Sequence, residues 1–182
     1  AGKSRAQLEP VDLNVLAHQT KELVGPSVAP NATLELELAT DLPAVTGVVG
    51  QLRQVLLNLV LNGLDSLEGA TGTVRVATST VTIADELDIH WLNADELPVG
   101  ACVSLVVEDT GCGMEPDTRE KIFDPFFSTK VEGRGLGLSA VLGIVRRHRA
   151  ALHLDSAPKR GTRFEILLPA ALGPAEPPST RL

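Results

Sequence analysis

Apolar positions recur along this chain with two different spacings, which predicts a mixture of helices and strands. Some segments repeat apolar residues every three or four positions, while others alternate apolar with polar residues or are rich in β-branched residues. The helices are expected at residues 13–24, 50–67, 116–122 and 138–148, and the strands at residues 34–38, 74–78, 102–107, 152–156 and 163–168. This order predicts an α+β fold: a two-layer sandwich with helices on one face of a mixed sheet.

The first helix shows how the pattern assigns residues to the core. Asp12 is a suitable N-cap, because its carboxylate accepts hydrogen bonds from the free N–H groups of the first turn. Gly25 and Pro26 are expected to end the helix. The side chains expected on its buried face are Leu13, Leu16, Thr20, Leu23 and Val24.

Two segments fit no regular element. Residues 84–100 are acidic and irregular, and we expect a hairpin loop there to which the sequence assigns no function. The tail that begins at Pro169 is rich in proline and glycine, a composition typical of a linker.

Composition narrows the possible functions. The 182 residues include 16 Lys and Arg against 23 Asp and Glu, a net charge of −7, and only 3% of them are aromatic. A nucleic-acid partner is therefore not expected, because phosphate contacts need clustered cations and base stacking needs aromatic rings. No apolar run is long enough to span a membrane, and two cysteines make no disulfide framework. The expected location is cytoplasmic, with the option that the chain is the cytoplasmic part of a membrane-bound sensor.

The second predicted helix carries a polar stripe. At 100° per residue its polar residues fall on one narrow face, while leucine and valine cover most of the remaining circumference. A helix so apolar is buried on most sides. The stripe either lines a cleft or is the solvent face of an amphipathic helix, although a solvent face more often uses Glu and Lys. The residues of the stripe are Gln51, Gln54, Asn58, Asn62 and Asp65.

Two glycine-rich segments follow the predicted third strand. Asp109 ends that strand and is followed by Gly111 and Gly113, so its carboxylate is placed to accept from an amino group of a ligand, and the glycines let backbone approach the ligand closely. Residues 133–139 (GRGLGLS) open the last helix, where free N–H groups and the helix dipole favour a phosphate. The Asp109 segment is also compatible with a plain turn, whereas residues 133–139 favour a phosphate site more strongly.

Together and in this order, five segments resemble the ATP-binding catalytic domain of sensor histidine kinases, in the superfamily shared with gyrase, the ninety-kilodalton heat-shock chaperones and MutL. The resemblance covers roughly residues 11–169, and the ordered set is far more specific than any single segment. Residues 58–66 (NLVLNGLDS) resemble the N box, 109–114 (DTGCGM) the first glycine box, 122–130 (IFDPFFSTK) the F box, 133–138 (GRGLGL) the second glycine box, and Gly161-Thr162 the final glycine-threonine element.

The resemblance implies a Bergerat-type fold, with a mostly antiparallel sheet and ATP bound between the N-box helix and a lid at residues 111–137. Asp109 would accept from the adenine amino group, and Thr162 would lie beside it. Asn62 would coordinate the Mg²⁺ ion that bridges the phosphates, with Asn58 beside it. Phe126 and Phe127 would anchor the lid on the core. The residues implied to hold nucleotide are Asn58, Asn62, Asp65, Asp109, Gly111, Gly113, Lys130, Arg134, Gly135, Leu136, Gly137, Leu138 and Thr162, of which Asn58, Asn62 and Lys130 would be catalytic.

One departure favours kinase chemistry over hydrolysis. The gyrase-like ATPases place Glu, a general base for water, at the position that resembles Asn58. An amide takes up no proton there, so transfer of the γ-phosphoryl group to a partner is favoured. Asp65 stands where many histidine kinases have a basic residue, and nitrogen-regulator-type kinases share the Asp.

The expected phosphoacceptor is absent. A histidine kinase carries its acceptor His on a dimerising helix hairpin, usually followed by Glu or Asp, and none of His18, His90, His148 and His153 has that context. Each of the four is expected to be a structural or surface histidine. Residues 1–10 are interpreted as the remnant of the preceding dimerisation helix, 11–170 as the catalytic domain and 171–182 as a tail or linker.

The predicted activity is therefore a catalytic fragment that binds ATP, ADP and Mg²⁺ and phosphorylates a dimerisation and phosphoacceptor domain, with a response regulator as an indirect partner. Alone it should be monomeric and should not phosphorylate itself. The alternatives are an anti-sigma-factor-type serine kinase, a non-catalytic ATP-binding module and a gyrase-like ATPase.

Overall fold

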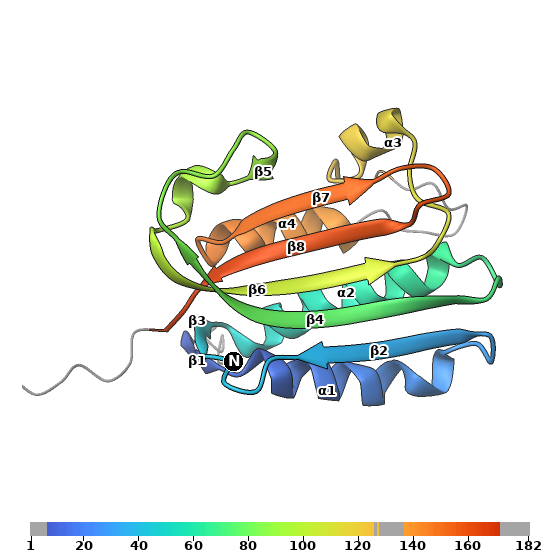
Figure 1. Ribbon diagram of the computed structural model, residues 1–182, viewed down its shortest axis with the longest axis horizontal. Helices are drawn as coiled ribbons and strands as arrows, with labels where there is room; N and C mark the ends of the chain where they lie inside the picture. The colour runs from blue at the N-terminus through green and yellow to red at the C-terminus, as the bar shows by residue number, and fades with distance from the viewer. Residues whose placement is uncertain (1–6, 126, 128–136, 172–182) are drawn as a thin grey trace, which may run out of the picture.

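A six-stranded sheet forms the framework of the protein (Figure 1). The computed structural model describes residues 7–125, 127 and 137–171. Two 3-10 turns, η1 (Gly25–Ser27) and η2 (Ala94–Glu96), accompany the regular elements. The helices are α1 (Leu13–Val24), α2 (Val49–Ser66), α3 (Pro116–Lys121) and α4 (Gly137–Arg147). The strands are β1 (Glu9–Val11), β2 (Ala32–Leu38), β3 (Val45–Gly47), β4 (Gly72–Ile83), β5 (Trp91–Leu92), β6 (Gly100–Asp109), β7 (Ala151–Ser156) and β8 (Thr162–Pro169).

The sheet is mixed and mostly antiparallel, as predicted. Its strand order is β2-β4-β6-β8-β7-β5, and β2 is the strand that pairs in parallel, with β4. The remaining neighbours of this sheet are antiparallel. In β6 and β8 the register places Asp109 opposite Thr162, so two residues expected at the nucleotide site lie side by side at one end of the sheet.

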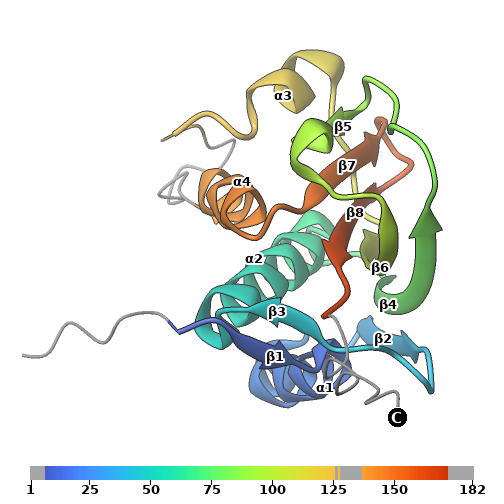
Figure 2. The same ribbon diagram turned by 90° about the vertical axis from the view of Figure 1, so that its left-hand side faces the viewer.

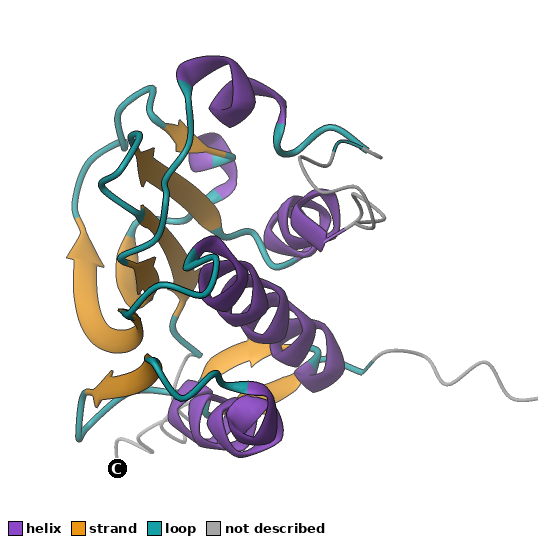
Figure 3. Cartoon of the chain, turned by 90° about the vertical axis from the view of Figure 1, so that its right-hand side faces the viewer, coloured by secondary structure: helices purple, strands orange, loops and turns teal. Residues whose placement is uncertain are grey.

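Helices α1, α2 and α4 cover one face of the sheet, and the main core lies between the two layers (Figure 3). The alternating residues Val103, Leu105 and Val107 of β6 face this core, and each is at most 3% exposed. From the helical layer, Leu56 and Leu59 of α2 are buried against them. The apolar circumference of α2 is therefore explained by its central place in this layer.

The segment between β4 and β6 is a hairpin connection, as predicted, because these strands are antiparallel neighbours, but it contains more structure than a plain loop. Strands β4 and β6 are longer than predicted, and their connection carries η2 and the short strand β5, which pairs with β7 at the sheet edge. Its side chains Leu87, Trp91 and Leu97 pack with Cys102 and Leu167 into a second apolar cluster. The sequence did not predict that these residues pack together, because they belong to turns and have no regular spacing.

The start of the chain requires two corrections. Glu9 and Pro10 belong to β1, which pairs with β3 beside α1 (Figure 2), so these two residues are part of the folded domain and not of a preceding helix. Asp12 caps α1 as predicted, accepting from the N–H groups of Asn14 and Val15. Leu23 is 60% exposed rather than buried, because it lies at the edge of the buried stripe of α1, which includes Ala17 instead.

No helix within the described ranges has both the length and the apolar character needed to cross a bilayer. The assignment of residues 1–6 to a dimerisation helix, and of 171–182 to a linker, stays a prediction.

Substitutions in the two helices should separate core from surface. Leu56→Ala should lower the free energy of unfolding by about 2–5 kcal/mol, because it removes a fully buried side chain and leaves a cavity. Leu23→Ala should change it by less than about 0.5 kcal/mol. Urea denaturation measures both free energies of unfolding. A large loss of stability in Leu23→Ala would contradict the exposed position of Leu23.

Candidate functional site

The polar stripe of α2 faces α4, the helix that follows the second glycine-rich segment. The side-chain amide of Asn58 donates from Nδ2 to the carbonyl oxygen of Gly137 at 3.2 Å, at the first residue of α4. Asn58 and Asn62 are half-buried, while Asp65 is exposed in the last turn of α2. The middle of the stripe, at Asn58, therefore faces the start of α4, whereas Gln54 and Asp65 are exposed to solvent.

Asn62 has the chemistry of a cation ligand. Among the described residues, no hydrogen bond involves its side chain, so its amide oxygen has free lone pairs. Oxygen ligands suit a hard cation such as Mg²⁺, and a neutral amide does not repel an anionic phosphate. No group of three or more His, Cys, Asp and Glu side chains suited to a metal occurs within the described ranges. An ion at Asn62 would therefore take most of its other ligands from phosphate and water.

Asp109 lies at the end of β6 and is 6% exposed. Its Oδ1 accepts from the Gly111 N–H at 2.8 Å and from the Ser66 hydroxyl at 2.8 Å, whose one proton is shared with the Gly63 carbonyl oxygen at 2.7 Å. The Thr162 backbone N–H also donates to the carboxylate. An ionised carboxylate has about four acceptor positions, so the three protein donors leave room for one more. A ligand N–H group can occupy that position.

Burial raises the pKa of Asp109 above its ordinary value of 3.8. The Ser66, Gly111 and Thr162 hydrogen bonds act in the opposite direction, because they stabilise the charged form, while the nearby Glu108 carboxylate raises the pKa further. Desolvation dominates because the side chain is almost wholly enclosed. An additional hydrogen-bond donor would stabilise the ionised carboxylate against this desolvation, and the amino group of a ligand can supply that donor.

The glycines around Asp109 are also required by the packing of the protein itself. A Cβ atom at Gly111 would lie 1.9 Å from Ser66 Oγ, and a Cβ atom at Gly113 would lie 1.9 Å from the Ala157 carbonyl oxygen. Gly161 is similarly crowded by the Asp109 carbonyl oxygen, and both Gly113 and Gly161 have positive φ angles. These glycines are therefore required for close packing of the protein around Asp109. Close approach of their backbone to a ligand, the reason expected from the sequence, stays a prediction.

Thr162 lies beside Asp109, as predicted, and its own side chain is also held. Its hydroxyl is 3.0 Å from the Ser156 hydroxyl, which donates to the Gly161 carbonyl oxygen. Thr162 is 4% exposed and Ser156 is 6% exposed. This buried pair fixes the turn between β7 and β8 next to the Asp109 carboxylate.

Part of the predicted site falls outside the described residues. Gly137 and Leu138 begin α4, where the half-buried Leu138 packs against the main core. In the expected lid, Pro116–Lys121 form α3 as predicted, and Phe127 packs against the core. Five residues of the predicted site and lid lie outside the described residues: Phe126, Lys130, Arg134, Gly135 and Leu136.

Sequence reasoning missed the role of Ser66. Its hydroxyl donates to Asp109 and its carbonyl oxygen accepts from the Cys112 N–H at 3.0 Å, so it joins the end of α2 to the first glycine-rich segment. The spacing could have indicated this role, because Ser66 follows Asn62 by four residues and so continues the polar stripe by one turn.

Comparisons with known proteins agree with this geometry. Residues 47–172 match the family model described as histidine kinase-, DNA gyrase B- and HSP90-like ATPase. The chain is 37% identical to the sensor kinase CckA of Brucella abortus over 88% of its length, and 32% identical to the histidine-protein kinase AtoS of Escherichia coli over 90%. It spans 17% of the first relative and 24% of the second.

Solved structures show the same fold. Full-length ShkA in complex with AMPPNP matches with a TM-score of 0.70 and 28% identity, over 96% of this chain and 34% of ShkA. The mycobacterial sensor histidine kinase MprB matches with a TM-score of 0.67 and 26% identity, over 90% of this chain and 98% of that one.

The raised pKa of Asp109 predicts an unusual pH dependence of stability. Since the folded protein binds this proton more tightly than the unfolded chain, the carboxylate destabilises the fold at about pH 7. The wild type should therefore become more stable relative to Asp109→Asn as the pH falls through the folded pKa toward 3.8. The quantity to compare is the difference between their free energies of unfolding. Urea denaturation at a series of pH values measures it. A difference that falls with acid would mean a lowered pKa.

Proposed function

Because the chain belongs to the family of histidine kinase-, DNA gyrase B- and HSP90-like ATPases, we propose that it is the catalytic domain of a two-component sensor histidine kinase. The family is one of ATP-binding domains, so ATP is the nucleotide of this site. In the proposed reaction, the γ-phosphoryl group passes from Mg-ATP to a His on a dimerisation and phosphoacceptor domain outside these 182 residues. The named relatives that match most of this chain are sensor kinases, which supports this choice within the family.

The observation that carries the proposal is the Asp109 carboxylate at the end of β6. It is buried, it is held by three protein donors, and one acceptor position is left for a ligand. An adenine ring presents an amino group that fits this acceptor. Thr162 is fixed beside the carboxylate and would border the same ring.

Asn58 supports phosphoryl transfer over hydrolysis. Its Nδ2 group is engaged with Gly137, so its amide oxygen is the atom available to the phosphates or the magnesium shell. An amide oxygen has too little basicity to take a proton from water. Without a general base here, attack by water is not promoted, and a bound acceptor is the better nucleophile.

The residues present fit a magnesium ion, which would neutralise charge on the phosphates when bound. Asn62 would supply an oxygen ligand, and Asn58 would lie in the shell around the ion. Asp65 at the next turn would contact the same shell. The remaining phosphate contacts are proposed for Lys130, Arg134, the backbone of Gly135–Leu138 and the dipole of α4.

The proposal extends to partners and location. The acceptor domain would belong to the same protein, and a response regulator would receive the phosphoryl group from it. These 182 residues alone would be monomeric, and the site would face the cytoplasm.

Nucleotide binding should depend on the Asp109 carboxylate. Asp109→Asn should weaken binding of ADP by about 10- to 100-fold, because it replaces a charge-assisted hydrogen bond to the adenine amino group by a repulsive N–H contact. Calorimetric titration with ADP and a non-hydrolysable ATP analogue, with and without Mg²⁺, measures the change. Asp95→Asn, at an exposed position in η2, is the matched control and should bind as the wild type does. Equal affinities of the two variants for ADP would contradict the proposed contact between Asp109 and adenine.

Phosphoryl transfer should need a second polypeptide. With γ-labelled ATP, the isolated chain should remain unlabelled and release little phosphate. A separately produced dimerisation and phosphoacceptor domain of the same protein should acquire an acid-labile label when the chain is added, and Asp109→Asn should slow this labelling.

Each competing function gives a different result in this assay. Acid-stable label on a protein partner would indicate a serine kinase, and steady phosphate release would indicate a gyrase-like ATPase. Binding of nucleotide without transfer to the acceptor domain would indicate a non-catalytic module.

A further inference from the structure

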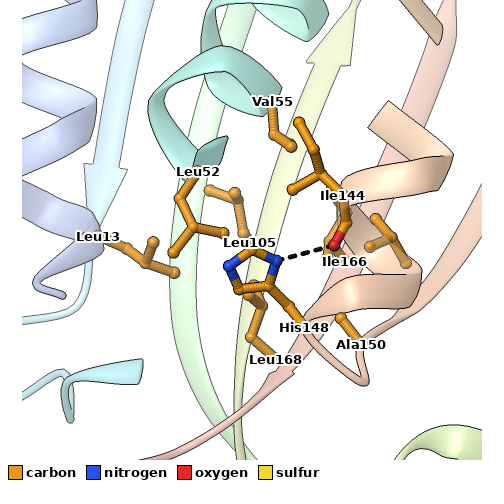
Figure 4. A pocket seen from close by; sticks show the side chains of 10 residues that line it. Leu13, Leu52, Val55, Leu105, Ile144, His148, Ala150, Ile166 and Leu168 are labelled. Carbon is orange, nitrogen blue, oxygen red and sulfur yellow. Dashed lines mark hydrogen bonds between the residues drawn. The ribbon is translucent and has the colours of Figure 1, made fainter. Parts of the chain in front are cut away.

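His148 is a buried polar side chain that the proposed reaction does not use. It follows α4 directly and is 7% exposed. Its Nδ1 atom lies 2.8 Å from the carbonyl oxygen of Ile144, one turn earlier in α4 (Figure 4). Its Nε2 atom lies 3.1 Å from the backbone nitrogen of Val48, the N-cap residue that precedes α2. The ring therefore bridges two helices whose contacting residues are 100 positions apart.

The two partners define the protonation state of the ring. A carbonyl oxygen only accepts, so Nδ1 carries the proton and donates to Ile144. A backbone N–H only donates, so Nε2 is unprotonated and accepts from Val48. His148 is thus a neutral imidazole in the Nδ1–H form, and both ring nitrogens are engaged.

The surroundings of the ring are apolar. The small cavity beside it is lined by aliphatic side chains from both layers of the sandwich (Figure 4), and no charged side chain of the described residues lines it. The neighbouring Arg146, Arg147 and Arg149 are exposed. Gly47 leaves room for the ring, since a Cβ atom there would lie 2.9 Å from its Cδ2 atom. The lining residues other than His148 are Leu13, Leu52, Val55, Leu105, Ile144, Val145, Ala150, Ile166 and Leu168.

Val48 is the anchor of α2. Its carbonyl oxygen accepts from the N–H groups of Gln51 and Leu52, and its side chain supplies no cap. The bond from Val48 N–H to His148 therefore fixes the first turn of α2 against the end of α4. Asn58, about 15 Å further along α2, bonds to Gly137 at the start of α4. The two helices are thus tied at both ends of α4.

We propose that His148 is a positioning residue for the nucleotide site. By holding Val48, it sets the position of α2 along α4, and so places Asn58 and Asn62 relative to the start of α4. The inference rests on the proposed function, because the groups that it positions are those assigned to the phosphates and the magnesium ion. A purely structural histidine would affect unfolding and leave the folded site unchanged.

Two substitutions separate these roles. His148→Phe keeps a flat ring in the apolar space and removes both hydrogen bonds, so the Val48 N–H loses its partner. His148→Gln supplies an amide oxygen that can accept from the Val48 N–H in place of His148 Nε2. Val24→Ala, a buried change at the end of α1, is the control for loss of stability without loss of the bridge.

The first readout is NMR of the nucleotide-free protein. In the wild type, the ¹⁵N shifts of His148 should show a protonated Nδ1 and an unprotonated Nε2. In His148→Phe, the amide signals of Val48 and the side-chain amide of Asn58 should shift and exchange faster with solvent. In His148→Gln and Val24→Ala, the Asn58 signals should stay close to those of the wild type.

The second readout is the affinity for ADP with Mg²⁺, measured well below the unfolding temperature. His148→Phe should weaken binding about fivefold, the size of one neutral hydrogen bond, while His148→Gln and Val24→Ala should bind as the wild type does. The proposal is overturned if Asn58 is unperturbed in His148→Phe, if Val24→Ala perturbs it equally, or if His148→Gln fails to restore it. A wild type that binds no nucleotide would instead refute the proposed function, and the Asn58 signals would still decide whether His148 positions that residue.

Discussion

The rest of the site depends on one buried carboxylate. Asp109 is held by donors from three separate parts of the chain: Ser66 at the end of α2, Gly111 just after β6, and Thr162 at the start of β8. These donors bring the N-box helix, the first glycine-rich segment and the β7–β8 turn to one point. The carboxylate is therefore a structural junction as well as the proposed contact for adenine, and the position of the nucleotide follows from the position of the junction.

This junction has a cost that a purely structural residue would not carry. Burial raises the pKa of Asp109 despite its hydrogen bonds, so the ionised side chain opposes folding at neutral pH. Gly113 and Gly161 add positive φ angles, which residues with a Cβ atom adopt poorly. The carbonyl oxygens of Ala157 and Asp109 also leave no space for a Cβ atom at these two positions. Proteins retain such costs mainly where a ligand relieves them or needs them. The crowding around Asp109 is therefore consistent with selection for binding instead of stability.

The sequence predicted the fold class and the adjacency of Asp109 and Thr162 at one end of the sheet, because both residues are marked by neighbouring glycines. It failed where burial depends on contacts between distant segments. Leu87, Trp91 and Leu97 have no period, yet they pack on the outer face of the sheet. The packing role of Gly111 and Gly113 was missed for the same reason, since the atoms that crowd them belong to Ser66 and Ala157. His148 resembled an ordinary structural histidine because its partner, Val48, is 100 residues away.

Helix α2 shows why a few polar contacts have so much effect in an apolar interior. Leucine and valine side chains bury α2 firmly, but apolar attraction has no direction and allows a helix to slide or rotate at little cost. Hydrogen bonds do have direction, and α2 makes one at its start through Val48, one in its middle through Asn58 and one at its end through Ser66. These three bonds reach His148, Gly137 and Asp109, so each fixes the helix against a different segment. The proposed contacts of Asn58 and Asn62 with magnesium and phosphate would require both side chains to be held to about half an ångström. Directional hydrogen bonds supply that precision, which the apolar core alone does not.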